Sequence, residues 1–333
     1  MRHPDPELDP SHIIPADELS AMIDAVVEAA TNFRYIEAGA LLERVQASIS
    51  HATDDEGESE APPALVAAAA RVQQLTAPGG ALEYVRARCA TCKEALHDLN
   101  EDASWSLASD RDGTRVQYKR TAETLSVKIE AVVDGVSPAD TIYVWREASL
   151  YKHWFPLMTD SRMLHEASIA DVALHLEADN MFAYSDLVLR GWGCDNLRDG
   201  YMLLCVRPVA EGELPPSVAV PPVQTKKRKM FPPRRVPAVI DILVEPLSAS
   251  SVRFAYAASL PVEPRVPHWA INVILQQGMA QIFSRMRDVA RKMAAGDPAS
   301  LHLQRMRDPE HAHVAEWIRE RVDPYVHALE ETL

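Results

Sequence analysis

Cysteine and positive charge are both scarce in this sequence. Four cysteines in 333 residues are too few for a disulfide framework. The 34 Lys and Arg residues are outnumbered by 48 Asp and Glu, which leaves a formal net charge of −14. Contacts to phosphates need a basic surface, so we expect no nucleic-acid partner and no general attraction to anionic membranes.

Long apolar runs are missing as well. No stretch approaches the roughly 20 apolar residues of a membrane-spanning helix. The N-terminal sequence MRHPDPE has neither the apolar segment of a signal peptide nor the acid-poor composition of a transit peptide. These features predict a cytoplasmic protein.

Known catalytic motifs are also absent. The sequence has no nucleophile elbow, phosphate-binding loop or HExxH motif. Cys89 and Cys92 form a CxxC pair, with His97 as a third ligand at best, whereas a structural zinc site needs four. The pair lies in a predicted helix, so two half-buried structural cysteines are the favoured interpretation. We therefore predict no catalytic residue, no metal, no cofactor and no enzymatic activity.

The N-terminal part of the chain has the periodicity of helices. Residues 53–60 form an acidic loop between its two halves. Residues 32–43 are similar to part of one tetratricopeptide unit, but solenoids need several units, which favours a plain helical hairpin over a peptide-binding repeat. Apolar residues at three- and four-residue spacing predict helices at about 17–30, 36–49, 63–75 and 81–99.

After Trp105 the pattern changes to the alternation of half-buried strands. Ser137 and Pro138 give the start signals of a helix that runs to about Leu150. A long helix is predicted at 268–293, and another short one from Asp308. The short connections between strands favour an antiparallel meander. The predicted strands are 115–120, 125–131, 163–166, 172–177, 185–190, 201–207, 239–245 and 252–259.

Several segments of this second part resemble one family. Residues 240–247 and 252–256 are similar to the last two strands of a START domain, the StAR-related lipid-transfer module. Residues 260–272, with Trp269, look like the family's entry into its lid helix. Trp145 and the sequence His153-Trp154-Phe155 fit its helix pair. The resemblance covers roughly residues 80–293.

One departure from the family pattern marks a divergent member. The family commonly has an arginine, an aspartate and an aromatic residue in sequence on a middle strand. Here the matching segment has Ser185, Asp186 and Leu187. A long insertion before Val239 is a further difference.

The resemblance implies an α+β helix-grip fold, in which a curved antiparallel sheet surrounds a long C-terminal helix. We expect an N-terminal helical region at 1–79, a START-like domain at 80–295 with a basic insertion at 215–237, and a helical tail at 296–333. The implied function is to hold one lipid or sterol in an internal cavity and to exchange it at membranes. The alternatives are an interaction adaptor that uses the N-terminal helices, or a helix-grip enzyme of the polyketide cyclase type.

A lipid cavity needs inward-facing apolar residues from the sheet and the lid. Alternation on the strands and helical spacing in the lid select these candidates, although the same residues also suit an ordinary packed core. Met279 favours a cavity, because flexible thioethers adapt to irregular ligands. The predicted lipid contacts are Val127, Ile129, Leu174, Leu176, Leu187, Ile242, Val244, Phe254, Tyr256, Leu275, Met279, Ile282 and Met286.

The basic insertion is the sharpest local feature of the sequence. Its positive charge is concentrated in an otherwise acidic chain, and it also contains Met230 and Phe231. A solvated loop, a nuclear-localisation signal and a docking patch for anionic lipid are all compatible with it. Apolar side chains within the cluster favour transient contact with a membrane. The predicted membrane contacts are Lys226, Lys227, Arg228, Lys229, Phe231, Arg234 and Arg235.

Overall fold

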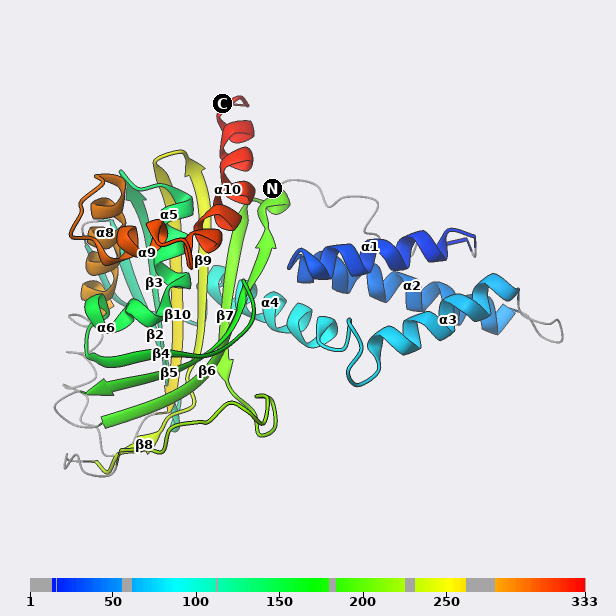
Figure 1. The fold of residues 1–333 in the computed structure, drawn as a ribbon, viewed down its shortest axis with the longest axis horizontal. Helices are drawn as coiled ribbons and strands as arrows, with labels where there is room; N and C mark the ends of the chain where they lie inside the picture. The colour runs from blue at the N-terminus through cyan, green and yellow to red at the C-terminus, as the bar shows by residue number, and fades with distance from the viewer. Residues whose placement is uncertain are drawn as a thin grey trace. The chain divides into compact units, whose positions relative to one another are not determined.

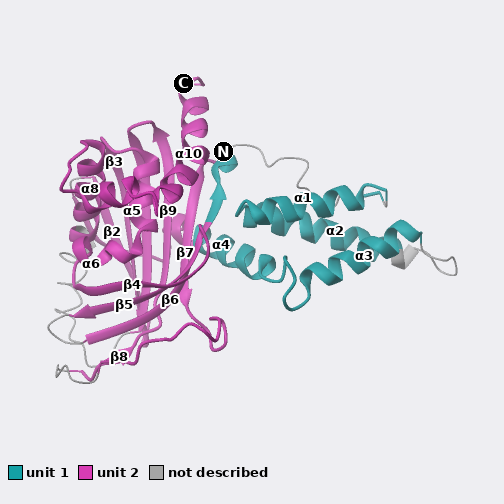
Figure 2. Ribbon diagram, viewed as in Figure 1, with its two compact units in different colours: residues 1–97, 194–199 teal, residues 98–193, 200–333 magenta. Residues whose placement is uncertain are grey.

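A computed structural model describes residues 14–15, 17–55, 62–111, 113–179, 184–224, 231–261 and 279–332. The chain divides into two compact units (Figure 2). Unit 1 contains residues 1–97 and 194–199, and unit 2 contains residues 98–193 and 200–333. The predicted boundaries after residues 79 and 295 stay predictions. This division keeps the helix that follows residue 80 with unit 1 as far as His97.

Unit 1 is a packed group of helices. A shared apolar core that includes Leu19, Ile23, Leu42 and Leu65 holds its first three helices together. Gly39 allows a close approach, because a Cβ atom there would lie 2.3 Å from the Sγ of Cys89. The helices are α1 (Leu19–Thr31), α2 (Tyr35–Asp55), α3 (Pro63–Thr76) and the part of α4 (Val85–Asn100) up to residue 97.

A ten-stranded sheet forms the centre of unit 2 (Figure 1). Its order is β1-β2-β3-β10-β9-β7-β6-β5-β4, with β8 beside β6. Each strand from β4 to β10, apart from the short β8, therefore lies next to its neighbour in sequence, as predicted for a meander. The strands are β1 (Ser106–Arg111), β2 (Thr114–Arg120), β3 (Thr124–Asp134), β4 (Met158–Ser168), β5 (Asp171–Asp179), β6 (Tyr184–Asn196), β7 (Tyr201–Pro208), β8 (Arg234–Arg235), β9 (Val239–Ser248) and β10 (Ser251–Pro261).

Helices cover one face of this sheet. Helix α8 packs against α5, β2 and β3, and α10 packs against α5 and β9 (Figure 1). The predicted N-cap of α5 is present, since the Ser137 hydroxyl accepts a hydrogen bond of 3.0 Å from the Asp140 amide. Residues 262–278, the predicted lid entry and first part of the lid helix, lie outside the described residues. The helices are α5 (Pro138–Arg146), η2 (Ala148–Leu150), α6 (Tyr151–Trp154), η3 (Leu197–Asp199, in unit 1), α8 (Met279–Ala294), α9 (Leu301–Arg307) and α10 (Ala312–Glu330).

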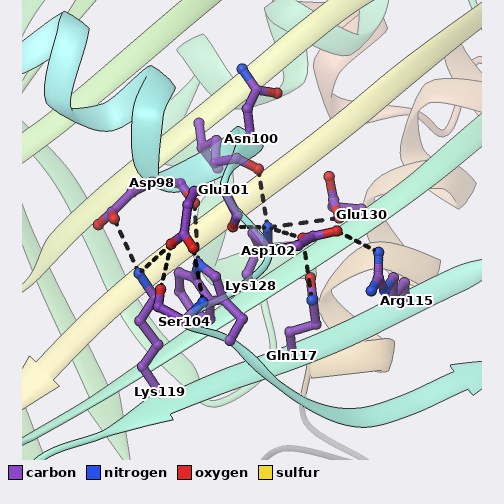
Figure 3. Close-up of polar contacts among 12 residues, drawn as sticks. Asp98, Asn100, Glu101, Asp102, Ser104, Arg115, Gln117, Lys119, Lys128 and Glu130 are labelled. Carbon is purple, nitrogen blue, oxygen red and sulfur yellow. Dashed lines mark hydrogen bonds and ion pairs between the residues drawn. The ribbon is translucent and has the colours of Figure 1, made fainter.

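The opposite face of the sheet carries a fully buried lysine, Lys128 of β3. Its ammonium group donates hydrogen bonds to the carbonyl oxygens of Leu99 and Glu101, at 3.1 and 3.0 Å, and to Asp102 Oδ1 at 2.9 Å (Figure 3). A lysine has three donors, so all of them are satisfied. Lys128 thus fastens the chain at the end of α4 to the sheet.

Candidate ligand cavity

The inner face of the sheet is set by residues that lie directly opposite one another on neighbouring strands. Tyr256 of β10 pairs with Ile129 of β3 and with Ile242 of β9, and Phe254 pairs with Val244. Directly opposed residues point to the same face of a sheet. The rings of Phe254 and Tyr256 stack on Trp145 of α5, with centroids 5.6 and 5.5 Å apart. This face is therefore the one that α5 covers.

A cavity of about 60 Å³ lies between this face and the helices. Its floor is formed by β5, β6, β7 and β9, and its cover by α5, α6 and α10. The wall is almost entirely apolar. Its residues are Ile142, Trp145, Arg146, Ala148, Tyr151, Ile169, Ala170, Val172, Leu174, Gly191, Trp192, Gly193, Met202, Leu204, Val206, Ile242, Val314, Trp317 and Ile318.

Two glycines of β6 help to create this space. A Cβ atom on Gly191 would meet Val206 Cγ2 at 3.4 Å, and one on Gly193 would meet Ala170 Cβ at 3.5 Å. Both are ordinary van der Waals distances, and neither glycine has the positive φ that would bar a side chain. Larger residues would therefore fit the backbone and fill the cavity.

Among the described residues of the cavity wall, Arg146 is the one charged side chain. Its Nε donates to the Ile169 carbonyl at 2.6 Å, and its Nη2 donates to Glu166 Oε1 at 2.6 Å. The neighbouring Glu147 forms an ion pair with Arg305 of α9. Because these charges are paired, the wall offers mainly apolar contact to a ligand.

The wall also contains a tyrosine that stays neutral. Burial raises the pKa of Tyr151, and its hydroxyl donates a hydrogen bond of 2.5 Å to the Trp145 carbonyl. A phenol with a raised pKa and its proton already engaged is poorly placed to transfer that proton. The arrangement suits binding better than acid–base chemistry.

The structure brings two of the predicted lipid contacts, Leu174 and Ile242, onto the wall of this cavity. Ile282 and Met286 are buried on α8, where the neighbouring Phe283 ring lies 6.0 Å from Phe254. Leu275 and the side chain of Met279 lie outside the described residues. The other predicted strand contacts are buried but do not line the cavity: Val127, Ile129, Leu176, Leu187, Val244, Phe254 and Tyr256. Their role as ligand contacts stays a prediction.

Sequence reasoning missed the part of the wall that α10 supplies. The helix predicted from Asp308 places Val314 and Ile318 on one apolar side, which is the only signal the sequence gives. Trp317 was not singled out. The spacing of a helix face does not say which surface it will cover.

The cavity is small. Typical ligand sites occupy about 300–1,000 Å³, whereas this one encloses about 60 Å³. The residues predicted to begin the lid, 262–278, lie outside the described part of the chain. The described walls therefore accommodate a ring or the end of a chain.

The basic insertion is only partly described. Lys226, Lys227, Arg228 and Lys229 lie outside the described residues, whereas Phe231 and Arg234 are half-buried. Arg235 of β8 donates from Nε to Asp186 Oδ1 at 2.5 Å and from Nη2 to the Pro221 carbonyl at 2.6 Å.

Asp186 is itself fully buried and lies 2.8 Å from the Nε2 of His175. The aspartate retained from the family pattern is thus paired with an arginine from the insertion. Within the described residues, no helix combines the length and apolarity needed to cross a membrane.

Comparison with known proteins gives matches among solved structures alone. No protein-family model matches the chain, and no curated protein does. Human STARD10 matches at 13% identity over 65% of this chain and 87% of that chain, with a TM-score of 0.50. Human StAR-related lipid transfer protein 5 matches at 13% identity over 61% and 94%, with a TM-score of 0.48.

A third match is a STAR-related lipid transfer protein from Xanthomonas axonopodis. It is 18% identical over 56% of this chain and 99% of that chain, with a TM-score of 0.45. At such identities, the likeness to STARD10 shows a shared fold and nothing about the ligand.

Proposed function

We propose, on the premise that this chain has the α+β helix-grip fold of START domains, that it binds one lipid or sterol and exchanges it at membranes. The observation that carries the proposal is the apolar cavity between the inner face of the sheet and helices α5 and α10. Its walls would shield the apolar part of a ligand from water, which is worth about 25 cal/mol for each Å² of apolar surface buried.

In this proposal the protein is a carrier and not an enzyme. The charges next to the cavity are paired, and the Tyr151 hydroxyl is engaged with a backbone carbonyl. These features support binding without bond cleavage over the alternative of a helix-grip cyclase. We further propose that the carrier works in the cytoplasm and that the basic insertion makes its membrane contact.

A groove in unit 1 favours a second candidate function, that of an interaction adaptor. The groove measures about 370 Å³ and is lined by side chains of α2 and α3 and by Arg86. Ile49 and Val72 supply its apolar part.

Native mass spectrometry of the purified protein tests the carrier function. We expect a bound molecule of lipid mass, which lipid analysis of an organic extract would identify. Gly191→Val should abolish this occupancy, because the new side chain fills the cavity. Val132→Leu, at an exposed position of β3, is the matched control and should leave it unchanged. Full-length protein that carries no lipid after gentle purification and takes up none from vesicles would refute the proposal.

A further inference from the structure

Helix α10 closes one side of the ligand cavity, although it lies outside residues 80–293, on which the sequence resemblance rests. Val314, Trp317 and Ile318 of α10 are all on the cavity wall. The helix is held against the rest of unit 2 by its buried apolar side and by an ion pair of 3.6 Å between Arg319 and Asp140 of α5. A segment beyond the resemblance thus contributes to the site.

Trp317 stands at the edge of the cavity. It is half-buried, and the guanidinium group of Arg321 lies 4.0 Å from its ring centroid. Val314 and Ile318, one turn apart on the same helix, are buried. The indole therefore has neighbours on the cavity side and a cation that holds its orientation.

Aromatic side chains are concentrated around this small space. Trp145, Tyr151 and Trp317 are on its wall, so a bound ring would have several aromatic neighbours. Ring faces interact best with other rings, at about 0.5–1.5 kcal/mol per pair beyond the burial of area. Across the floor, Gly191 and Gly193 present no side chain, which leaves room for a flat group.

We propose that α10 is a wall of the ligand site and that its Trp317 makes the cavity select a compact, ring-bearing apolar group over a straight alkyl chain. This inference rests on the proposed carrier function. A volume of about 60 Å³ suits a single ring. A rigid ring also loses less conformational freedom on binding than a chain with several rotatable bonds.

Three alcohols of seven carbons provide the test: benzyl alcohol, cyclohexylmethanol and 1-heptanol. We would titrate each alcohol into the full-length protein freed of lipid, and follow its binding by calorimetry and by tryptophan fluorescence. The two ring compounds should bind at least about tenfold more tightly than 1-heptanol, a difference of about 1.4 kcal/mol. Burial of apolar area alone predicts the opposite order, because the open chain exposes the most apolar surface.

Variants test whether Trp317 causes the preference for ring compounds over 1-heptanol. Trp317→Leu should reduce the tenfold preference to about twofold or less, while Gly191→Val should abolish binding of all three alcohols. Val326→Ala is the matched control, since Val326 is a buried residue of α10 that does not line the cavity. It should weaken the packing of the helix and keep the preference. Thermal unfolding of each variant checks that the fold is intact.

The outcomes separate this inference from the carrier function. Equal or tighter binding of 1-heptanol, or an unchanged preference in Trp317→Leu, would overturn the inference while a co-purified lipid still supports a carrier. Failure of all three alcohols to bind a protein that does carry lipid would also overturn it. The absence of both alcohol and lipid binding would instead refute the carrier function.

Discussion

Lys128 shows how much one side chain can hold in place. Its ammonium group is buried and satisfies two backbone carbonyls as well as Asp102. We expect Lys128→Met to lower the free energy of unfolding by about 2–3 kcal/mol, because it leaves those acceptors without a charged donor. Lys119→Met is the control, since the ion pair of Lys119 with Asp98 is partly exposed and worth about 0–1 kcal/mol. Urea denaturation of both variants measures the difference, and equal losses would contradict the prediction.

His302, at the start of α9, should make stability depend on pH. Burial, followed by the nearby charges of His153 and Arg305, lowers its pKa to about 4 from 6.5. The unfolded chain therefore binds a proton below pH 6.5 that the folded chain refuses, and stability falls as the pH drops from about 6.5 to about 4. At 1.36 kcal/mol per unit the loss reaches about 3 kcal/mol.

The control for this prediction is His302→Leu, which cannot titrate. Its free energy of unfolding should fall less than that of the parent as the pH drops through this range. The difference between the two losses should be about the amount assigned to His302. Identical pH profiles for the two proteins would show that other groups cause the acid sensitivity.

For a single residue, the sequence predicts the chemical character of the side chain better than the residues that it will contact. Alternation places Lys128 on the polar face of β3, which predicts solvent exposure, yet the end of α4 covers it. Nothing local connects Arg235 with Asp186, which lies 49 positions earlier. Such pairs depend on how distant segments fold together, and periodicity carries no information about that.

The helices and strands with a clear hydrophobic periodicity were predictable from the sequence. Every strand predicted after Trp105 is present, and the N-cap at Ser137 marks the start of α5 as expected. Strand β1, the two-residue strand β8 and helix α9 were missed. Strand β1 has the pattern SLASDR, with two half-buried and four exposed residues, so it lacks the apolar alternation that marks a strand. Helix α9 is seven residues long, too short for a helical period to emerge.

The helix α10 offers an element-scale test. Ile318 is 1% exposed at the centre of its buried side. We expect Ile318→Asp to detach α10 while the sheet stays folded, because a buried carboxylate without a partner costs several kcal/mol. Hydrogen exchange should then speed up at least about tenfold in α10 and on α5, but not in β3 and β10. Glu316→Gln, on the exposed side of the same helix, is the control. A cooperative loss of the whole fold would show that α10 is not a separable cover.

For the whole molecule, net charge and local charge make opposite predictions about membranes. A protein of net charge −14 is repelled by an anionic surface, while each cation near that surface contributes about 1 kcal/mol at low salt. Changing Lys226, Lys227, Arg228 and Lys229 to glutamine should abolish low-salt binding to anionic vesicles and leave neutral vesicles unaffected.

The control for the vesicle assay removes the same charge elsewhere, through Arg86→Gln, Lys93→Gln, Arg111→Gln and Arg307→Gln. It should retain most of the binding, which should weaken at high salt as screening shortens the range of the charges. Equal loss in both variants would assign the effect to net charge and not to the basic insertion.

The division of unit 1 into two stretches of sequence has a consequence for protein synthesis. The strand end at residues 194–199 belongs to unit 1: the Asp195 amide donates to the Phe33 carbonyl at 2.9 Å, and Arg198 pairs with Glu37 at 2.8 Å. These residues leave the ribosome about 100 positions after His97. At a synthesis rate of roughly 5–20 residues per second, residues 194–199 follow the N-terminal helices after about 5–20 s. Translation rate therefore sets how long the nascent helices remain without them.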